Sequence, residues 1–434
     1  MTRFPRKSVL ASCTIALLLL APAAARPQNY RGCAWPIELS PEGLGNYLAP
    51  EILARYWAMP FQKQDGTMTI EGTYPDARYF SFVVYKTNAS HGPVDAASHL
   101  YDAEIAPDRG TTNPFVKPGG ERGTYTVTVD VTDSPATQGA GNAMTVDSDF
   151  AWVMLRIYEP TADPSVSGKS LTGKVPLPTI RLSGSGGAEP LKPCSPANKL
   201  DDVVNFVRTF FPENFDLVGD EGMPRTDRLW FAAPTKPPPL LLPNPDNKYI
   251  AMFPGNDYQP GRIIVIHGRA PSFPGTYDGT PVWEPAPGFR NVDMRFWSMC
   301  NTDLALPVPT VSCAADLTTD LEGGHYTVVI SDDLLRPDWL QPGTTWLPWG
   351  DAGYLKVVFL RNMLPAPGFR FSIQKAIEAG CTFVFDLPYL PDRKDVDRMG
   401  HCAARVMGDY YPVAAWCDKS RYVHGGWRAC LHGH

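Results

Sequence analysis

The chain has 434 residues and a formal net charge of −6 at pH 7, with 44% hydrophobic and 19% charged residues. This length suffices for two or three domains, each able to bury a hydrophobic core. An acidic balance without a run of basic residues argues against nucleic acid and anionic membranes as partners. The 45 prolines and 37 glycines favour strands, turns and extended connections over long helices.

The N-terminus has the three regions of a secretory signal peptide. Basic residues precede an apolar run, and alanines ending at Ala25 follow it, so we expect residues 1–25 to be removed during export. A lipoprotein signal at Leu10–Cys13 is the alternative, but most of the apolar run follows that cysteine when it should precede it. Because no later segment is apolar enough to span a bilayer, we predict a soluble protein that is secreted, or periplasmic in a Gram-negative host.

Removal of the signal peptide leaves an even number of cysteines, which in an exported chain predicts up to four disulfides. Proximity along the chain suggests one pair, Cys300 with Cys313. Several cysteines lie close to C-terminal histidines, so a zinc site is the alternative. The chain lacks the CxxC or HxxxH spacing of zinc sites, which favours disulfides and predicts no metal. The eight cysteines are Cys33, Cys194, Cys300, Cys313, Cys381, Cys402, Cys417 and Cys430.

Two octets, PDARYFSF at 75–82 and VDMRFWSM at 292–299, share an Asp, a spacer, an Arg, two aromatics and a Ser. The segments around them recur in the same order: YWAMPF and YIAMFP, GTMTIEG and GRIIVIHG, GTYTVTV and GHYTVVI, WVMLRIY and VVFLRNM. Such self-similarity indicates an internal repeat, and therefore a duplicated domain.

The recurring blocks are rich in Val, Ile, Thr, Tyr and Phe, which is typical of β-strands, and no helices alternate with them. We predict a mainly β fold of two tandem homologous β-sandwich or jelly-roll-like domains, with a few short helices and a disulfide-rich C-terminal cap. Helical patterns are found at 50–57, 201–211, 371–379 and 394–409. The predicted organisation is a signal peptide at 1–25, a first repeat at 26–180, a Pro/Gly-rich linker with a short helix at 181–245, a second repeat at 246–380 and a Cys-rich cap at 381–434.

The order of the motifs carries a family resemblance. CAWP at 33–36, the octet at 75–82, RNMLPAPGF at 361–369 and a late YYP followed by Cys follow one another along the chain. In this the sequence resembles exported bacterial proteins of unknown function, related to a β-rich domain found C-terminal in some cell-envelope proteins. The resemblance implies architecture and export, and it assigns no catalytic residue.

Each octet, as a strand, places its Asp and its Arg on one face: Asp76 with Arg78, and Asp293 with Arg295. The two side chains can form an ion pair that fixes the strand register. Alternatively, the arginine can lie at the mouth of an apolar cavity and bind a carboxylate or phosphate in its planar fork. A second arginine in each repeat, Arg156 in the first, can likewise either form a structural ion pair or bind an anion.

The second repeat carries two histidines that the first lacks at the equivalent positions, His267 and His325. Histidine is the commonest general acid or base at neutral pH. With Asp293 as orienter and Arg361 as anion stabiliser, these residues would form a hydrolase or lyase site, although isolated strand histidines are more often structural. No GxSxG elbow, P-loop or GxGxxG unit is present, which argues against a serine nucleophile and predicts no cofactor.

Tryptophans suggest a binding function. Trp346 and Trp349 lie in a Pro/Gly-rich stretch, where an exposed indole can stack on a sugar ring, and Arg295 and Trp297 lie on the second octet. We therefore predict a pocket in the second repeat that binds an extracellular small molecule or glycan. The alternatives are the His-dependent hydrolase or lyase and a structural envelope or matrix protein.

Overall fold

The computed structural model divides the chain into two compact units. Unit 1 comprises Met1–Tyr47 and Ala54–Phe215, and unit 2 comprises Leu48–Leu53 and Asp216–His434. The predicted signal peptide and Trp283 lie outside the residues that the structure describes. These are residues 32–87, 95–117, 122–132, 141–160, 172–185, 189–210, 227–236, 241–255, 258–274, 292–305, 307–385 and 390–431.

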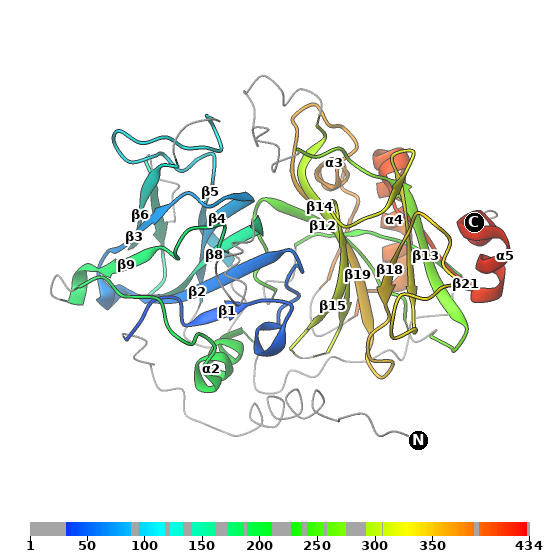
Figure 1. Ribbon diagram of the computed structural model, residues 1–434, viewed down its shortest axis with the longest axis horizontal. Coiled ribbons are helices and arrows are strands. Elements are labelled where there is room, and N and C mark those ends of the chain that lie inside the picture. Colours follow the sequence, from blue (N-terminus) through cyan, green and yellow to red (C-terminus); the bar gives the residue numbers. More distant parts are fainter. Residues whose placement is uncertain are drawn as a thin grey trace. The chain divides into compact units, whose positions relative to one another are not determined.

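Unit 1 is a β-sandwich, drawn from blue to green in Figure 1. Its two sheets meet through aromatic rings: Phe80 and Phe82 of one sheet lie 5.6 and 5.8 Å from Tyr125 of the other, between ring centroids. The first sheet has the order β1 (Ile37–Leu39), β2 (Ala54–Gln62), β8 (Phe150–Pro160), β4 (Ala77–Lys86) and β5 (Asp95–Tyr101). The second has the order β7 (Ala143–Val146), β6 (Thr124–Val131), β3 (Met68–Thr73) and β9 (Thr179–Leu182).

Unit 2 is also a β-sandwich. Its first sheet has the order β12 (Asn247–Met252), β19 (Lys356–Pro365), β14 (Met294–Asp303) and β15 (Thr310–Ala315). Its second sheet has the order β10 (Arg228–Leu229), β21 (Val413–Asp418), β13 (Arg262–Arg269), β17 (His325–Ser331) and β16 (Leu321–Glu322), with β18 (Thr344–Pro348) also paired to β17. A small parallel pair consists of β11 (Ala233–Pro234) and β20 (Thr382–Phe383).

The strand order confirms the predicted duplication. The series β2-β8-β4-β5 of unit 1 corresponds to β12-β19-β14-β15 of unit 2, and β7-β6-β3-β9 corresponds to β18-β17-β13-β21. The outermost pair of the second sheet is parallel in both units, β6 with β7 and β17 with β18. The register agrees as well, since Ser81 lies opposite Arg156 and Ser298 lies opposite Arg361.

Unit 2 has a central core between its sheets. β13 contributes Ile264 and Ile266, and β19 contributes Val358 and Leu360, to one buried cluster. Because side chains alternate along a strand, the intervening residues point outward. Those of β13 pack with α5, whereas those of β19 pack in a separate cluster with the Cys300–Cys313 pair. The two outer faces of the sandwich are therefore separated by the full thickness of the core.

Three of the four predicted helical segments, at 201–211, 371–379 and 394–409, are helices in the structure, and the one at 50–57 is not. Residues from Ala54 onward form β2, which is buried along nearly its whole length between β1 and β8. Burial on both faces removes the alternation that would have marked a strand. The helices are α2 (Leu200–Phe210), α3 (Ile373–Glu378), α4 (Arg393–Met407) and α5 (Lys419–Leu431), with 3-10 turns η1 (Gly43–Gly45), η2 (Lys63–Asp65), η3 (Ser183–Ser185) and η7 (Gly408–Tyr410).

The C-terminal segment 381–434 is rich in disulfides, as predicted. Its strand β21 also joins the second sheet of unit 2, between β10 and β13. It occupies the place that β9 occupies in unit 1. The predicted linker 181–245 is likewise integrated: its α2 packs Phe206 against Trp152 of β8, at 4.7 Å between ring centroids, and its β10 and β11 belong to sheets of unit 2.

All eight predicted cysteines are paired, which confirms the disulfide prediction, including Cys300 with Cys313. Export to an oxidising compartment is the setting in which such bonds persist. None of the helices in the described part of the chain is long and apolar enough to cross a membrane. The other three bonds are Cys33–Cys194, Cys381–Cys402 and Cys417–Cys430.

Candidate functional site

The structure does not bring the predicted catalytic residues together. His267 lies on β13, and its side chain points to the outer face of unit 2 where α5 packs. Arg361 lies on β19, and its side chain points to the other outer face of unit 2, where the cluster around Cys300 packs. The central core separates the two, so His267 and Arg361 cannot act on one substrate. The hydrolase or lyase arrangement is therefore corrected on geometric grounds.

His267 and His325 belong to a stack of rings. The His267 ring lies 3.7 Å from Trp427 at an interplanar angle of 10°, and 5.6 Å from His325 at 3°, between centroids. Its Nδ1 lies 3.1 Å from the Thr327 hydroxyl. Burial, and to a lesser extent the charges of His325 and Arg428, lowers the pKa of His267 to about 4. A ring stacked in this way and neutral at ordinary pH supports the sheet more readily than it exchanges protons with a substrate.

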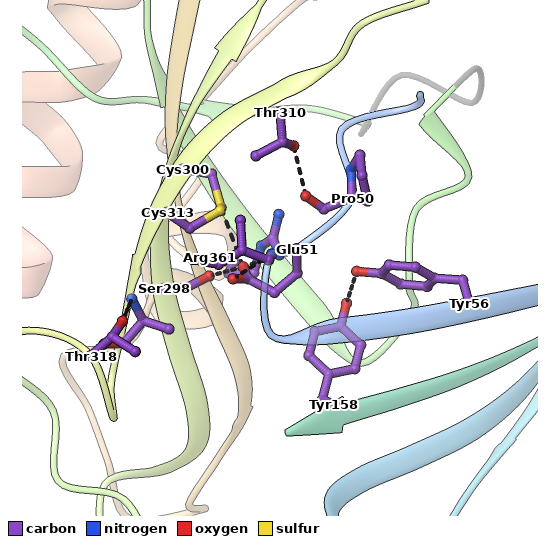
Figure 2. Close-up of a disulfide and its surroundings, with 12 residues drawn as sticks. Pro50, Glu51, Tyr56, Tyr158, Ser298, Cys300, Thr310, Cys313, Thr318 and Arg361 are labelled. Atoms are coloured by element: carbon purple, nitrogen blue, oxygen red, sulfur yellow. Dashed lines mark hydrogen bonds and ion pairs between the residues drawn. A yellow bond between two sulfur atoms is a disulfide. The ribbon is translucent and has the colours of Figure 1, made fainter. Parts of the chain in front are cut away.

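Arg361 is held in a buried ion pair. Its guanidinium donates to the carboxylate of Glu51, which also accepts from the Ser298 hydroxyl at 2.5 Å (Figure 2). Glu51 and Arg361 are 0% and 3% exposed as side chains. The same carboxylate approaches Cys300 Sγ at 3.2 Å, and with Cys313 these groups are close enough together to hold a metal ion. Because both sulfurs are in a disulfide, they offer no thiolate, and the arrangement fits an anchor for the Leu48–Leu53 segment.

The predicted binding tryptophans are not exposed platforms. Trp297 is 0% exposed and donates its indole N–H to the Pro271 carbonyl at 3.1 Å, and Trp349 is 3% exposed in the central core. Trp346 is half-buried and donates to the Ser331 hydroxyl at 2.9 Å. Arg295 is 1% exposed on β14. These four residues pack within unit 2 and are not exposed platforms, and their predicted role in glycan binding stays a prediction.

Asp293 does lie at a surface arrangement of polar and aromatic groups. One carboxylate oxygen accepts from the Ser272 backbone N–H at 2.9 Å and lies 3.0 Å from its hydroxyl. The carboxylate also accepts a hydrogen bond from the Tyr410 hydroxyl. Its backbone carbonyl accepts from Ala366 N–H at 2.8 Å. Asp293 thus ties together three loops and η7 at one end of the sandwich.

At this end the side chains form what we call the rim site: Arg269, Arg370, Phe371 and Tyr410, positioned by Asp293. The Tyr410 and Phe371 rings are stacked at 5.6 Å and 18°. The Arg269 guanidinium carbon lies 5.1 Å from the centre of the Tyr410 ring, and that of Arg370 lies 5.0 Å from the centre of the Phe371 ring. Two cations and two aromatic rings therefore form a continuous surface.

Local structure explains why these residues meet. Arg269 is the last residue of β13, and the turn after β19 leads through Arg370 and Phe371 to Ser372, whose hydroxyl caps α3 by accepting from Lys375 N–H at 3.3 Å. α4 ends at Gly408, which has φ 55°, a conformation that glycine adopts without strain. The chain reversal there brings Tyr410 back over the sheet. Loops at one end of a sandwich are a common location for binding residues.

The rim site differs electrostatically from the buried Arg361 ion pair. Arg269 and Arg370 are exposed, and within the described part of the chain each has a ring contact but no ion pair or hydrogen bond. Burial, then the charge of Asp293, raises the pKa of Tyr410 above its ordinary value. The phenol therefore stays protonated at neutral pH and can donate a hydrogen bond, but it is a poor base.

Sequence reasoning found Asp293 but missed the four rim-site side chains. Arg370 and Phe371 follow RNMLPAPG directly, and an arginine beside an aromatic in a Pro/Gly-rich turn was a usable signal. Arg269 and Tyr410 gave no such signal, because they are 141 residues apart in the chain and meet only in the folded unit.

Comparisons add little to this geometry. No protein-family model matches the chain, and no curated protein matches it significantly. Among solved structures, an uncharacterized protein from Burkholderia cenocepacia has a TM-score of 0.49 and 13% identity over 84% of this chain and 88% of its own. A protein from Vibrio parahaemolyticus has a TM-score of 0.35 and 12% identity over 73% of this chain and 85% of its own.

Proposed function

We propose that the chain is an exported, non-catalytic glycan-binding protein that uses the rim site of unit 2. Four disulfides and the N-terminal signal pattern support export. The observation that carries the binding proposal is the stacked Tyr410 and Phe371 pair, partly exposed at a loop end and flanked by two exposed arginines.

Aromatic rings and guanidinium groups are suited to sugars. The exposed part of an aromatic ring packs against the apolar C–H groups of a pyranose, while neighbouring N–H and O–H donors bind the hydroxyl groups. Phe369, which is 7% exposed, supports both rings from below, at 5.0 Å from Tyr410 and 6.2 Å from Phe371 between centroids. A platform held in this way loses little conformational entropy on binding.

Binding is better supported than catalysis at the same place. Asp293 is already engaged by Ser272 and Tyr410, so its carboxylate is not available to take a proton from a substrate. Tyr410 has a raised pKa, and the carboxylate that accepts its hydrogen bond is Asp293, which Ser272 also engages. The rim site therefore has donors and apolar faces, which orient a ligand, without the acid–base pair that a hydrolase or lyase needs.

Affinity electrophoresis in gels containing neutral or acidic polysaccharides tests this function. We expect retardation by at least one polymer, and we expect the double variant Tyr410→Ala/Phe371→Ala to lose it. The matched control is Tyr354→Ala, which removes an aromatic of the same unit that is 48% exposed and remote in sequence from the rim site. Thermal unfolding of both variants checks that the fold is retained.

Two outcomes would overturn the proposal. Retardation by no polysaccharide of the panel would leave the structural envelope or matrix role as the better hypothesis. Retardation that survives in the Tyr410→Ala/Phe371→Ala variant would place binding elsewhere on the chain.

A further inference from the structure

The two rim-site arginines differ from several arginines of the chain that form ion pairs, and both contact one connected pair of aromatic rings. Arg78 pairs with Glu159 at 2.9 Å, Arg181 with Glu71 at 3.2 Å and Arg262 with Asp227 at 2.8 Å. Within the described part of the chain, Arg269 and Arg370 have aromatic partners only. The chain carries a net charge of −6, and among the described residues these two exposed cations share one pair of stacked rings without an ion-pair partner.

From this we propose that the rim site recognises a uronate-containing polysaccharide, with Arg269 and Arg370 each binding a sugar carboxylate and the exposed edges of the Tyr410 and Phe371 rings contacting the sugar units. This inference rests on the proposed glycan-binding function and specifies its ligand class. Arginine is suited to the task because its planar fork matches a carboxylate in a bidentate geometry, and the guanidinium keeps its charge at every accessible pH.

The spacing of the groups favours a polymer over a single sugar acid. Arg269 reaches Tyr410 at 5.1 Å, Tyr410 reaches Phe371 at 5.6 Å, and Phe371 reaches Arg370 at 5.0 Å. The two cations thus belong to one connected surface that a short run of sugar units can follow. A chain that carries repeated carboxylates can engage both arginines at once, which raises its avidity over that of a monomer.

Packing on a ring also prepares each guanidinium for binding. A cation over an aromatic face is attracted to it, which restricts the long arginine side chain without occupying its N–H donors. A carboxylate that arrives then forms charge-assisted hydrogen bonds with a group that is already oriented. Because the site is exposed, added salt should weaken the interaction.

The experiment compares three polymers with the full chain by isothermal titration at low salt. These are polygalacturonate, the same polymer with its carboxyl groups reduced to alcohols, and dextran sulfate. We expect polygalacturonate to bind at least about tenfold more tightly than either of the others, a difference of about 1.4 kcal/mol, which the loss of one charge-assisted bidentate contact accounts for. Arg269→Gln and Arg370→Gln should each weaken polygalacturonate binding by about tenfold.

The control is Arg398→Gln, which removes the same charge from an exposed arginine of unit 2 that already pairs with Asp395 at 2.7 Å. Its affinity should match that of the unchanged chain. Equal binding of polygalacturonate and the reduced polymer would overturn the uronate assignment and leave the glycan-binding function standing. Equal binding of dextran sulfate would overturn it too, because the site would then respond to charge alone. If no polymer binds, the proposed function fails with it.

Discussion

The two units have an arginine at the equivalent position of equivalent strands, but different groups surround its charge. In unit 1 the Arg156 guanidinium donates to the Tyr85 hydroxyl and lies 5.4 and 5.8 Å from the centres of the Tyr85 and Tyr56 rings. In unit 2 the equivalent Arg361 pairs with the Glu51 carboxylate. Duplication has preserved the backbone position, while the neighbours decide whether a buried charge meets phenols or a carboxylate.

The ends of the two octets differ in the same way. In unit 1 the exposed Asp76 carboxylate lies 3.2 Å from the Lys174 ammonium and 3.6 Å from the Arg122 guanidinium, so it pairs with two cations. In unit 2 the equivalent Asp293 is bonded to Ser272 and Tyr410, and the cations nearby lie over aromatic rings. At the end of the first octet the cations are therefore paired with a carboxylate. At the end of the second, among the described residues, the cations have no carboxylate partner and can bind an external anion.

The largest expected effect comes from removing the carboxylate in unit 2. Glu51→Gln keeps the size of the side chain but leaves the Arg361 charge buried without its ion-pair partner. Breaking a buried pair in this way costs about 3–5 kcal/mol. The free energy of unfolding, measured by urea titration, should fall by that amount.

The matched change in unit 1 is Tyr85→Phe, which removes one neutral hydrogen-bond acceptor from Arg156. A lost acceptor of this kind costs about 1–3 kcal/mol. Equal losses for Glu51→Gln and Tyr85→Phe would contradict the comparison, because a carboxylate and a phenol would then stabilise a buried arginine equally.

A second pair of changes tests whether the units are truly equivalent in their cores. Gly72 lies opposite Tyr125 in unit 1, and Gly268 lies opposite Tyr326 in unit 2. A Cβ at either glycine would lie 2.4 or 2.7 Å from the facing tyrosine hydroxyl, so Gly→Ala should cost about 1–3 kcal/mol at both sites. Tyr125→Phe and Tyr326→Phe remove the closest atom and should each restore part of the loss in unfolding experiments. A large cost at only one site would contradict equivalence.

The sequence predicted these shared features because they repeat locally. Five blocks recur in one order, and a strand prediction needs only the residues of the strand itself. The Cys300–Cys313 bond was also predictable, since its two cysteines are 13 residues apart. Tertiary burial overrode the local pattern at 50–57, where residues from Ala54 onward form the buried strand β2.

The partners of charged residues were not predictable from the sequence. Arg78 pairs with Glu159, not with the nearby Asp76, and Glu51 meets Arg361 across 310 positions. Such partners depend on which strands lie side by side and where a connecting segment returns. The rim site escaped prediction for the same reason, because its residues come from three separate segments.

A smaller effect should distinguish the units in acid. The pKa of His267 is lowered from 6.5 to about 4 in the folded chain, so the unfolded chain binds more protons between those values. Stability is therefore full above about pH 6.5 and falls as the pH decreases toward about 4, by about 1 kcal/mol because the ring is partly exposed. His267→Gln should remove this dependence in urea titrations at several pH values, whereas Glu71→Gln at the equivalent position of unit 1 should leave it in place. An unchanged dependence in His267→Gln would show that another group is responsible.

The smallest effect on stability concerns the two octet ends, where the comparison bears on function. Lys174→Gln removes one exposed ion pair of Asp76 and should lower the free energy of unfolding by less than about 1 kcal/mol, since exposed pairs contribute little. It should leave polygalacturonate affinity unchanged, because that cation is already engaged. Arg269→Gln should cost no more stability, as it loses only an exposed ring contact, yet it should weaken polygalacturonate binding. If Lys174→Gln weakened polygalacturonate binding as much as Arg269→Gln, the ends of the two octets would be functionally alike. A cation already paired with a carboxylate would then bind the ligand as well as one without an ion pair.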